Sequence, residues 1–390
     1  MSFYQIGILG SPQAAHQAAL RQSIQEMIHP FGLSIGDGLD VLDPAACLTR
    51  EPKAAFSAVF FGGPPFDQDS LQALTTLVHG NHPVIPLVED LRTFSSNVPS
   101  ILRSANGMAL ATAGTNLEAL AAALLECVGL LRRQRRVFIS YRRIESANAA
   151  LQLHDALGSR GFEVFLDTYD VRPADDFQAI VWHRLCDSDV MVMLDTPGYF
   201  GSRWTAAEIG RALAKKIAVL GVVWPDHQPE RVSQLREPIF LQNADLQGRD
   251  GPLTAPVVER ILSTVERLRS RSLAIRHAAI AGALRSATEE IGGSVVAIGA
   301  HRGMKIILAD GRILCAFPAV GVPTAEHFHE AAEHLKLVDH ATAPAPVLVY
   351  DHVGLHQRWQ RHLDWLHENL HVVKMLQITQ AAWQLADWPT

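Results

Sequence analysis

Short hydrophobic runs alternate with amphipathic stretches from the N-terminus to about residue 270. Alternating strands and helices are typical of an α/β fold with a doubly wound parallel sheet. Between residues 137 and 223 the runs are almost continuously apolar, as expected for strands that helices cover on both faces. The hydrophobic runs of the whole stretch predict strands at Gln5–Leu9, Ala58–Phe61, Val84–Val88, Val137–Ser140, Glu163–Leu166, Val190–Leu194, Ile217–Val223 and Ile239–Leu241.

Apolar residues at helical spacing predict the helices between these strands. Near the N-terminus, Gly10-Ser11-Pro12 opens a helix, because the missing N–H of Pro12 costs nothing in a first turn. The Gly7-x-x-Gly10 spacing lacks the full dinucleotide fingerprint, so we interpret it as a tight turn, with a nucleotide role as the alternative. Further along, helices are predicted at Ser146–Arg160, Asp176–Cys186, Arg203–Lys215 and Val257–Arg269.

Beyond about residue 273 the pattern is that of a small α+β domain. The Asp310-Gly311 step lies between two short apolar runs and predicts a hairpin. Helices are predicted at Ala274–Glu290, Ala325–Leu337 and His356–Leu370, and strands at Ser294–Ile298, Lys305–Leu308, Arg312–Phe317 and Val347–Tyr350.

A chain of 390 residues is too long for one typical core, so several domains are expected. The basic run Arg132–Arg136 marks a boundary, where cations complement the C-terminus of the preceding helix. We predict a Rossmann-like α/β domain at residues 1–133 for regulation or assembly. A second α/β domain with a parallel five-stranded sheet is predicted at 134–271, and an α+β domain for sensing or oligomerisation at 272–390.

The composition, 48% hydrophobic and 19% charged, is typical of a folded globular protein. A formal net charge of −6 gives no general attraction to nucleic acid or an anionic membrane, so we expect neither as a partner. No signal peptide or membrane-spanning run is recognisable. The four cysteines form no CxxC pair, which favours neither a disulfide scaffold nor a thiolate zinc site. We therefore expect a cytoplasmic protein.

Polar motifs follow three successive strands of the second predicted domain. Ser140-Tyr141-Arg142 follows Phe138-Ile139, Asp167 and Tyr169 follow the next strand, and Ser202-Arg203-Trp204-x-x-x-Glu208 follows the third. The carboxyl ends of parallel strands meet at one edge of a sheet, where ligands of such folds bind. Trp204 and Glu208 are four apart, hence neighbours on one helical face. The motifs therefore predict one ligand site.

In this order and spacing, the motifs resemble the Toll/interleukin-1 receptor (TIR) domain in its bacterial, NAD-cleaving form. The resemblance covers only the second domain and implies a flavodoxin-like fold. It implies that Glu208 is the catalytic carboxylate, that NAD+ is the substrate, and that neither a cofactor nor a metal is needed. It also implies a substrate pocket lined by Ser140, Tyr141, Arg142, Asp167, Tyr169 and Trp204.

Loss of nicotinamide from NAD+ develops positive charge on the ribose, which a fixed carboxylate stabilises. Nicotinamide leaves as a neutral base, so a single glutamate suffices without a general acid. Structural alternatives remain, because Thr205-x-x-Glu208 also fits a capping box and Trp204 also fits a core position. Ser140 and Asp167 can equally well be residues that only end their strands.

The resemblance further implies activation by self-assembly, in which a loop of one TIR domain completes the pocket of its neighbour. That loop often carries Pro-Gly, whereas this chain has Ala174 after Pro173, without the conformational freedom of glycine. The loop residues expected to make the assembly contact are Arg172, Pro173, Asp175 and Phe177. The implied biology is a homo-oligomer or filament in bacterial antiphage defence, switched on by an unknown ligand or protein.

Three other functions stay open from the sequence. One is a non-catalytic TIR scaffold that binds protein partners, another is a nucleoside or nucleotide-sugar hydrolase, and the third is a sensor whose first domain binds a nucleotide. The histidines of the last domain do not add a metal site: His327, His329 and His334 lack zinc-protease spacing and fit an amphipathic helix. The stripe from His356 to Leu370 is predicted to be a packing face or a contact between copies.

Overall fold

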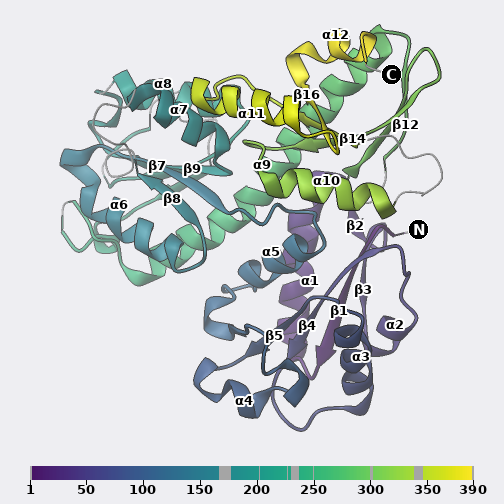
Figure 1. The fold of residues 1–390 in the computed structure, drawn as a ribbon. Coiled ribbons are helices and arrows are strands. Elements are labelled where there is room, and N and C mark those ends of the chain that lie inside the picture. Colours follow the sequence, from purple (N-terminus) through teal and green to yellow (C-terminus); the bar gives the residue numbers. More distant parts are fainter. Residues whose placement is uncertain are drawn as a thin grey trace. The chain divides into compact units, whose positions relative to one another are not determined.

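The computed structural model describes residues 2–166, 177–201, 203–225, 227–229, 237–248, 250–298, 302–337 and 346–388. The chain divides into two compact units, Met1–Arg133 and Gln134–Thr390. Figure 1 shows one sheet in the first unit and two in the second. No helix among the described residues is both long and apolar enough to cross a membrane.

The first unit is a parallel α/β sheet with strand order β2-β3-β1-β4-β5-β6. Its three predicted strands are confirmed as β1, β4 and β5, whereas β2, β3 and β6 were not predicted. Gly10 has a φ of 81°, and a Cβ there would lie 2.1 Å from the Phe61 carbonyl oxygen, so a tight turn requires this glycine. The strands are β1 Tyr4–Gly10, β2 Ser34–Ile35, β3 Gly38–Leu42, β4 Ala55–Phe61, β5 Val84–Val88 and β6 Met108–Ala109, and the helices are α1 Ala14–Ile28, α2 Pro44–Leu48, α3 Gln68–His79, α4 Phe94–Asn97 and α5 Glu118–Cys127.

The first sheet of the second unit is parallel, with order β11-β10-β9-β7-β8. Alternate residues of β7 enter different cores: Val137 and Ile139 pack with α6 and α9, and Phe138 packs with α7 and α8. The sheet is therefore doubly wound, as predicted. Its strands are β7 Arg136–Ser140, β8 Glu163–Leu166, β9 Val190–Asp195, β10 Ala218–Val223 and β11 Glu237–Phe240, and its helices are α6 Arg143–Gly158, α7 Phe177–Asp187, α8 Arg203–Ala214 and α9 Ala255–Glu290.

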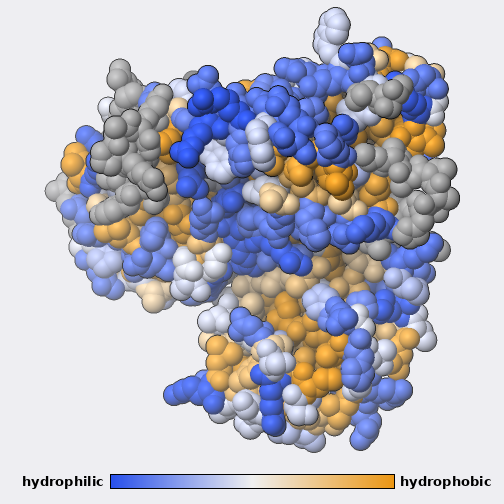
Figure 2. Space-filling model, viewed as in Figure 1, coloured by the Kyte–Doolittle hydropathy of each residue, from blue (hydrophilic) through white to orange (hydrophobic). Residues whose placement is uncertain are grey.

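The last sheet is mixed, with order β12-β13-β14-β15-β16. Strands β12 to β14 are antiparallel, and the predicted turn at Gly311 has a φ of 84°. Strand β16 and helix α12 were not predicted. Figure 2 shows hydrophobic surface where the edge strand β12 lies in Figure 1, and Val296 and Ile298 are half exposed there. The elements are β12 Ser294–Ile298, β13 Met304–Ile307, β14 Ile313–Ala319, β15 Pro346–Tyr350, β16 Lys374–Gln377, α10 Ala325–Leu337, α11 Gln357–Asn369 and α12 Ala381–Ala386.

Helix α9 corrects one prediction. Two helices were expected, at Val257–Arg269 and Ala274–Glu290, but α9 is continuous from Ala255 to Glu290. Ser270 and Ser272 are fully buried, and the Ser272 hydroxyl accepts a hydrogen bond from the Ala218 N–H at 3.2 Å. The polar sequence there is thus part of a packed helix, whose two halves serve the two sheets of this unit.

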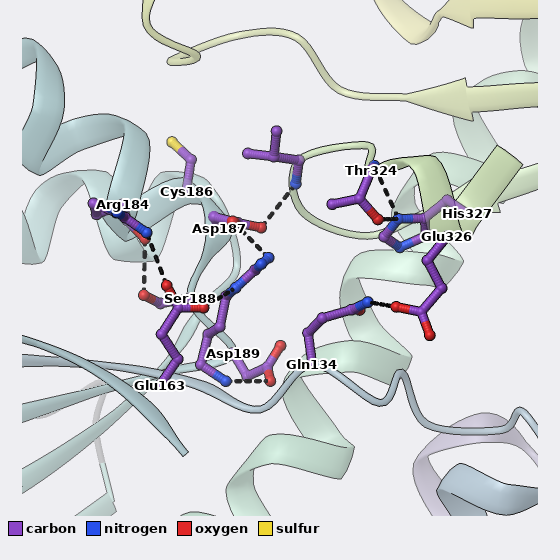
Figure 3. Close-up of polar contacts among 12 residues, drawn as sticks. Gln134, Glu163, Arg184, Cys186, Asp187, Ser188, Asp189, Thr324, Glu326 and His327 are labelled. Carbon is purple, nitrogen blue, oxygen red and sulfur yellow. Dashed lines mark hydrogen bonds and ion pairs between the residues drawn. The ribbon is translucent and has the colours of Figure 1, made fainter. Parts of the chain in front are cut away.

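Polar contacts join the last sheet to the sheet of β7 to β11, here called the TIR-like sheet. They lie at its amino-terminal edge, where β7 and β9 begin (Figure 3). The Asp187 carboxylate at the end of α7 is central: it accepts from the Val322 N–H at 2.9 Å and from the Arg136 guanidinium at 2.6 Å. Gln134 donates to Glu326 of α10. The contacts lie at the opposite edge of the sheet from the carboxyl ends of its strands.

A fully buried ion pair fixes α9 to the same edge. Arg269 Nε lies 2.9 Å from Asp189 Oδ2, and neither side chain is exposed to solvent. Two residues earlier, Arg267 pairs with Glu237, but its side chain is 41% exposed. The two arginines therefore make the same kind of contact in different dielectric surroundings.

The substitution Arg269→Leu is expected to lower the free energy of unfolding by about 3–5 kcal/mol, because it leaves the Asp189 charge buried without this partner. Arg267→Leu is the matched control and should cost no more than about 1 kcal/mol, since exposed ion pairs are screened by solvent. Urea denaturation of both variants checks this. Equal losses would show that burial does not set the strength of the Arg269 contact.

His183 of α7 is buried against the last domain. Its ring stacks on Trp359 of α11 with centroids 5.4 Å apart, and its Nδ1 accepts from the His356 N–H at 3.4 Å. Burial lowers the pKa of His183 from 6.5 to about 4, although the nearby Asp187 charge opposes the shift. The folded protein therefore holds this histidine neutral.

Stability is expected to fall as the pH drops from 6.5 towards 4, because in this range the unfolded chain protonates His183 and the folded chain does not. The loss attributable to His183 should approach about 3 kcal/mol. The check is the free energy of unfolding at several pH values for the wild type and His183→Phe. Parallel curves for the two proteins would show that His183 does not contribute.

Candidate functional site

The strands of the TIR-like sheet bring their carboxyl ends to one edge, where β7 ends at Ser140 and β9 at Asp195. The two strands are neighbours, with Ser140 paired to Met193. Residues that follow these strands are thereby gathered without being close in sequence. The sequence predicted a ligand site at this edge.

A chain of three buried polar side chains lies at the end of β7. Ser140 Oγ is 2.5 Å from Glu208 Oε2 of α8 and 2.5 Å from the Tyr199 hydroxyl. Ser140 donates its only proton to the carboxylate, so the Tyr199 hydroxyl donates to Ser140. Ser140 is 2% exposed, Tyr199 0% and Glu208 7%. Of the predicted site residues, Ser140 and Glu208 are therefore in direct contact.

The local sequence explains this placement. Ser140 lies two residues after Phe138 and faces the same helices, because strand residues alternate between faces. Ile209 and Ala212 pack α8 onto that face and so place Glu208 beside the strand end. Thr205 donates to the Tyr199 carbonyl at 2.6 Å, which ties the turn after β9 to α8.

The capping-box alternative for Glu208 is wrong. Helix α8 begins at Arg203, so Thr205 already lies within its first turn and is not the cap. The Thr205 hydroxyl donates to the Tyr199 carbonyl, and the Glu208 carboxylate accepts a hydrogen bond from Ser140 at the end of β7. Glu208 is thus a tertiary contact.

Tyr141 and Arg142 do not join this cluster. Tyr141 is 7% exposed and packs in the core beneath α6 and α9, on the opposite face of the sheet from Glu208. Arg142 forms an ion pair with Glu145 of α6. Burial alone acts to raise the pKa of Glu145, but hydrogen bonds, including one from the Gly198 N–H at 3.0 Å, and the Arg142 charge hold it below its usual value. Substrate contact by Tyr141 or Arg142 stays a prediction.

The other predicted site residues lie largely outside the described part of the chain. Phe177 begins α7 and Trp204 is the second residue of α8, which places both in the expected helices, but only their backbones are described. Their expected roles, in substrate binding or in assembly, stay predictions. The residues outside the described ranges are Asp167, Tyr169, Arg172, Pro173, Asp175 and Ser202.

A cavity of about 830 Å³ lies at the same edge of the sheet, a volume within the range of small-molecule sites. The predicted site at this edge did not include the residues that line the cavity, although Trp224 and Pro225 directly follow the apolar run of β10. The described lining of the cavity comes from the segments after β7, β9, β10 and β11 and does not include the Ser140–Tyr199–Glu208 cluster. The lining residues are Ile144, Glu145, Thr196, Pro197, Trp224, Pro225, Asn243, Leu246, Gly248 and Asp250.

The sequence prediction also missed a histidine–carboxylate pair. His227 Nε2 lies 3.1 Å from Asp195 Oδ1, and Asp195 is fully buried. The signal available was an aspartate ending an otherwise apolar strand, where a buried charge needs a partner. Its partner comes from the segment after β10, which spacing along the chain does not reveal.

Ser140→Ala is expected to lower the free energy of unfolding by roughly 1.5–3 kcal/mol, since a hydrogen bond to a buried carboxylate is lost. Tyr199→Phe should cost about 1 kcal/mol, and the double variant less than the sum, because both act through Ser140. Ser159→Ala, at an exposed hydroxyl, is the control and should stay within about 0.5 kcal/mol of the wild type. Additive losses measured by urea denaturation would contradict a connected cluster.

Residues 137–252 match the family model of the TIR domain. No curated protein matches the chain. Among solved structures, one described as a two-component system response regulator/GGDEF domain protein has 14% identity and a TM-score of 0.25, over 67% of this chain and 97% of that one. The tagatose-6-phosphate ketose/aldose isomerase of Escherichia coli has 10% identity and a TM-score of 0.21, over 70% and 82%. TM-scores this low support no inference about function.

Proposed function

Because residues 137–252 of this chain form a TIR domain, we propose that the domain is an enzyme that cleaves the nicotinamide–ribose bond of NAD+. In this proposal Glu208 is the catalytic carboxylate, and the product is ADP-ribose or its cyclic form. Neither a cofactor nor a metal takes part in this chemistry.

One observation carries the proposal: Ser140, Tyr199 and Glu208 converge from three segments at the carboxyl edge of the TIR sheet. A carboxylate fixed by a hydroxyl cannot turn away as charge develops, and a preoriented negative group stabilises an oxocarbenium ion without reorganisation. The low local dielectric of a buried site strengthens that attraction.

The small exposed fraction of Glu208, 7%, bears on regulation. A ribose can reach the carboxylate only after a neighbouring segment has moved, so the isolated chain should be a poor enzyme. We infer that activation requires self-association through TIR domains, set off by a ligand or protein partner, as in antiphage defence. The flanking sheets are then the regulatory parts.

A non-catalytic scaffold is the alternative function. The same low exposure favours it, because a buried glutamate bonded to Ser140 can act purely as a structural contact that fixes α8 to the sheet. The two functions differ in one measurable quantity, the release of nicotinamide.

Glu208→Gln is expected to reduce nicotinamide release from NAD+ by about 100-fold or more, since the amide keeps the shape but loses the charge that stabilises the ribose cation. Release should be measured over a range of protein concentrations, with particle size recorded on the same samples, so that isolated and assembled chains are both tested.

The matched control is Glu163→Gln, at a carboxylate of the same sheet whose side chain is 55% exposed. It should keep wild-type activity, because Glu163 begins β8 at the amino-terminal edge. If the wild type releases no nicotinamide in any assembly state, the enzyme proposal fails and the scaffold is favoured.

A further inference from the structure

The pair formed by Asp195 and His227 has the arrangement of a proton-transfer dyad. Asp195 Oδ1 lies 3.1 Å from His227 Nε2, and the carboxylate is fully buried while the imidazole side chain keeps 13% of its surface exposed. An aspartate that accepts a hydrogen bond from one ring nitrogen holds the ring in place and stabilises it when the other nitrogen takes up a proton.

The dyad lies on the same face of the sheet as the Glu208 cluster. Ser140 pairs with Met193 across β7 and β9, and Asp195 lies two residues beyond Met193. Side chains two apart on a strand point to the same face, so Asp195 points with Met193 towards the side of α7 and α8. Ser140, which holds Glu208, points to that side from the neighbouring strand.

The segment that follows strand β10 supplies the imidazole of the dyad. Val223, the last residue of β10, pairs with Asp195, and the Trp224 N–H donates to the Asp195 carbonyl at 2.9 Å. His227 follows three residues later. The ends of three neighbouring strands, β7, β9 and β10, thus bring the Glu208 cluster and an imidazole to one edge and one face of the sheet.

From this juxtaposition we propose that His227, oriented by Asp195, is the proton acceptor that activates water for hydrolysis at the Glu208 site. The assignment rests on the proposed NAD+ cleavage. Glu208 stabilises the ribose cation, whereas His227 acts on the nucleophile, so the two groups have separate tasks.

The bond between nicotinamide nitrogen and ribose C1′ breaks, and its electron pair leaves with neutral nicotinamide. Water oxygen bonds to C1′, and one water proton passes to Nδ1 of His227, whose Nε2–H stays on Asp195. The products are ADP-ribose and a protonated imidazole, which returns its proton to solvent.

A nucleophile that has no proton to lose distinguishes the role of His227 from that of Glu208, because its attack needs no general base. Isonicotinamide attacks C1′ through its ring nitrogen and exchanges for nicotinamide without proton transfer. For His227→Gln we expect hydrolysis to fall by about 100-fold or more, the usual contribution of a general base. Exchange with isonicotinamide should persist at the wild-type rate, and Glu208→Gln should lose both reactions.

A second variant tests whether a loss of hydrolysis comes from misfolding and not from the missing imidazole. His227→Ala removes the imidazole, and free imidazole added to the assay should restore part of its hydrolysis. The assignment of His227 is overturned if hydrolysis and exchange fall equally in His227→Gln, or if imidazole restores no hydrolysis to His227→Ala. Neither outcome affects the NAD+ proposal itself. A wild type that performs neither reaction would overturn the NAD+ proposal and this assignment with it.

Discussion

The hydrogen bond from Ser140 to Glu208 is the contact on which the candidate site depends. It joins the end of β7 to α8 at 2.5 Å, inside a region from which water is nearly excluded. A carboxylate in such a place is costly unless it is bonded. The strand end supplies that bond, and the Tyr199 hydroxyl continues it. The strand end therefore fixes the position of the Glu208 carboxylate.

The two edges of the TIR sheet carry different contacts. At the carboxyl edge, strand ends gather Ser140, Asp195 and the segments that carry Glu208 and His227. At the amino-terminal edge, buried charges tie the sheet to α9 and to the last domain, as the pair of Arg269 and Asp189 shows. The candidate site and the attachment to the last domain are thus separated by the length of the strands.

Much of the fold was predictable from local pattern. Near-continuous apolar runs identified β7, β8, β9 and β10, because helices cover both faces of the sheet there. The edge strand β11 carried a weaker signal, since only Ile239 of its four residues is buried. The continuity of α9 was missed, since Ser270 and Ser272 are polar and the sequence does not reveal that both are buried. Strand β16 was missed as well, because it lies at an edge and half of its residues are not buried.

The sequence by itself determined the TIR domain and its alternation of strands and helices, and it singled out Ser140 and Glu208 as candidates, because all of these are encoded in residues close together or in motifs of fixed spacing. Only the tertiary structure decided that Tyr141 faces the other side of the sheet, that Glu208 bonds to a strand end, and that Asp195 meets His227. Strand order and helix packing create those neighbours, and no local spacing along the chain records them.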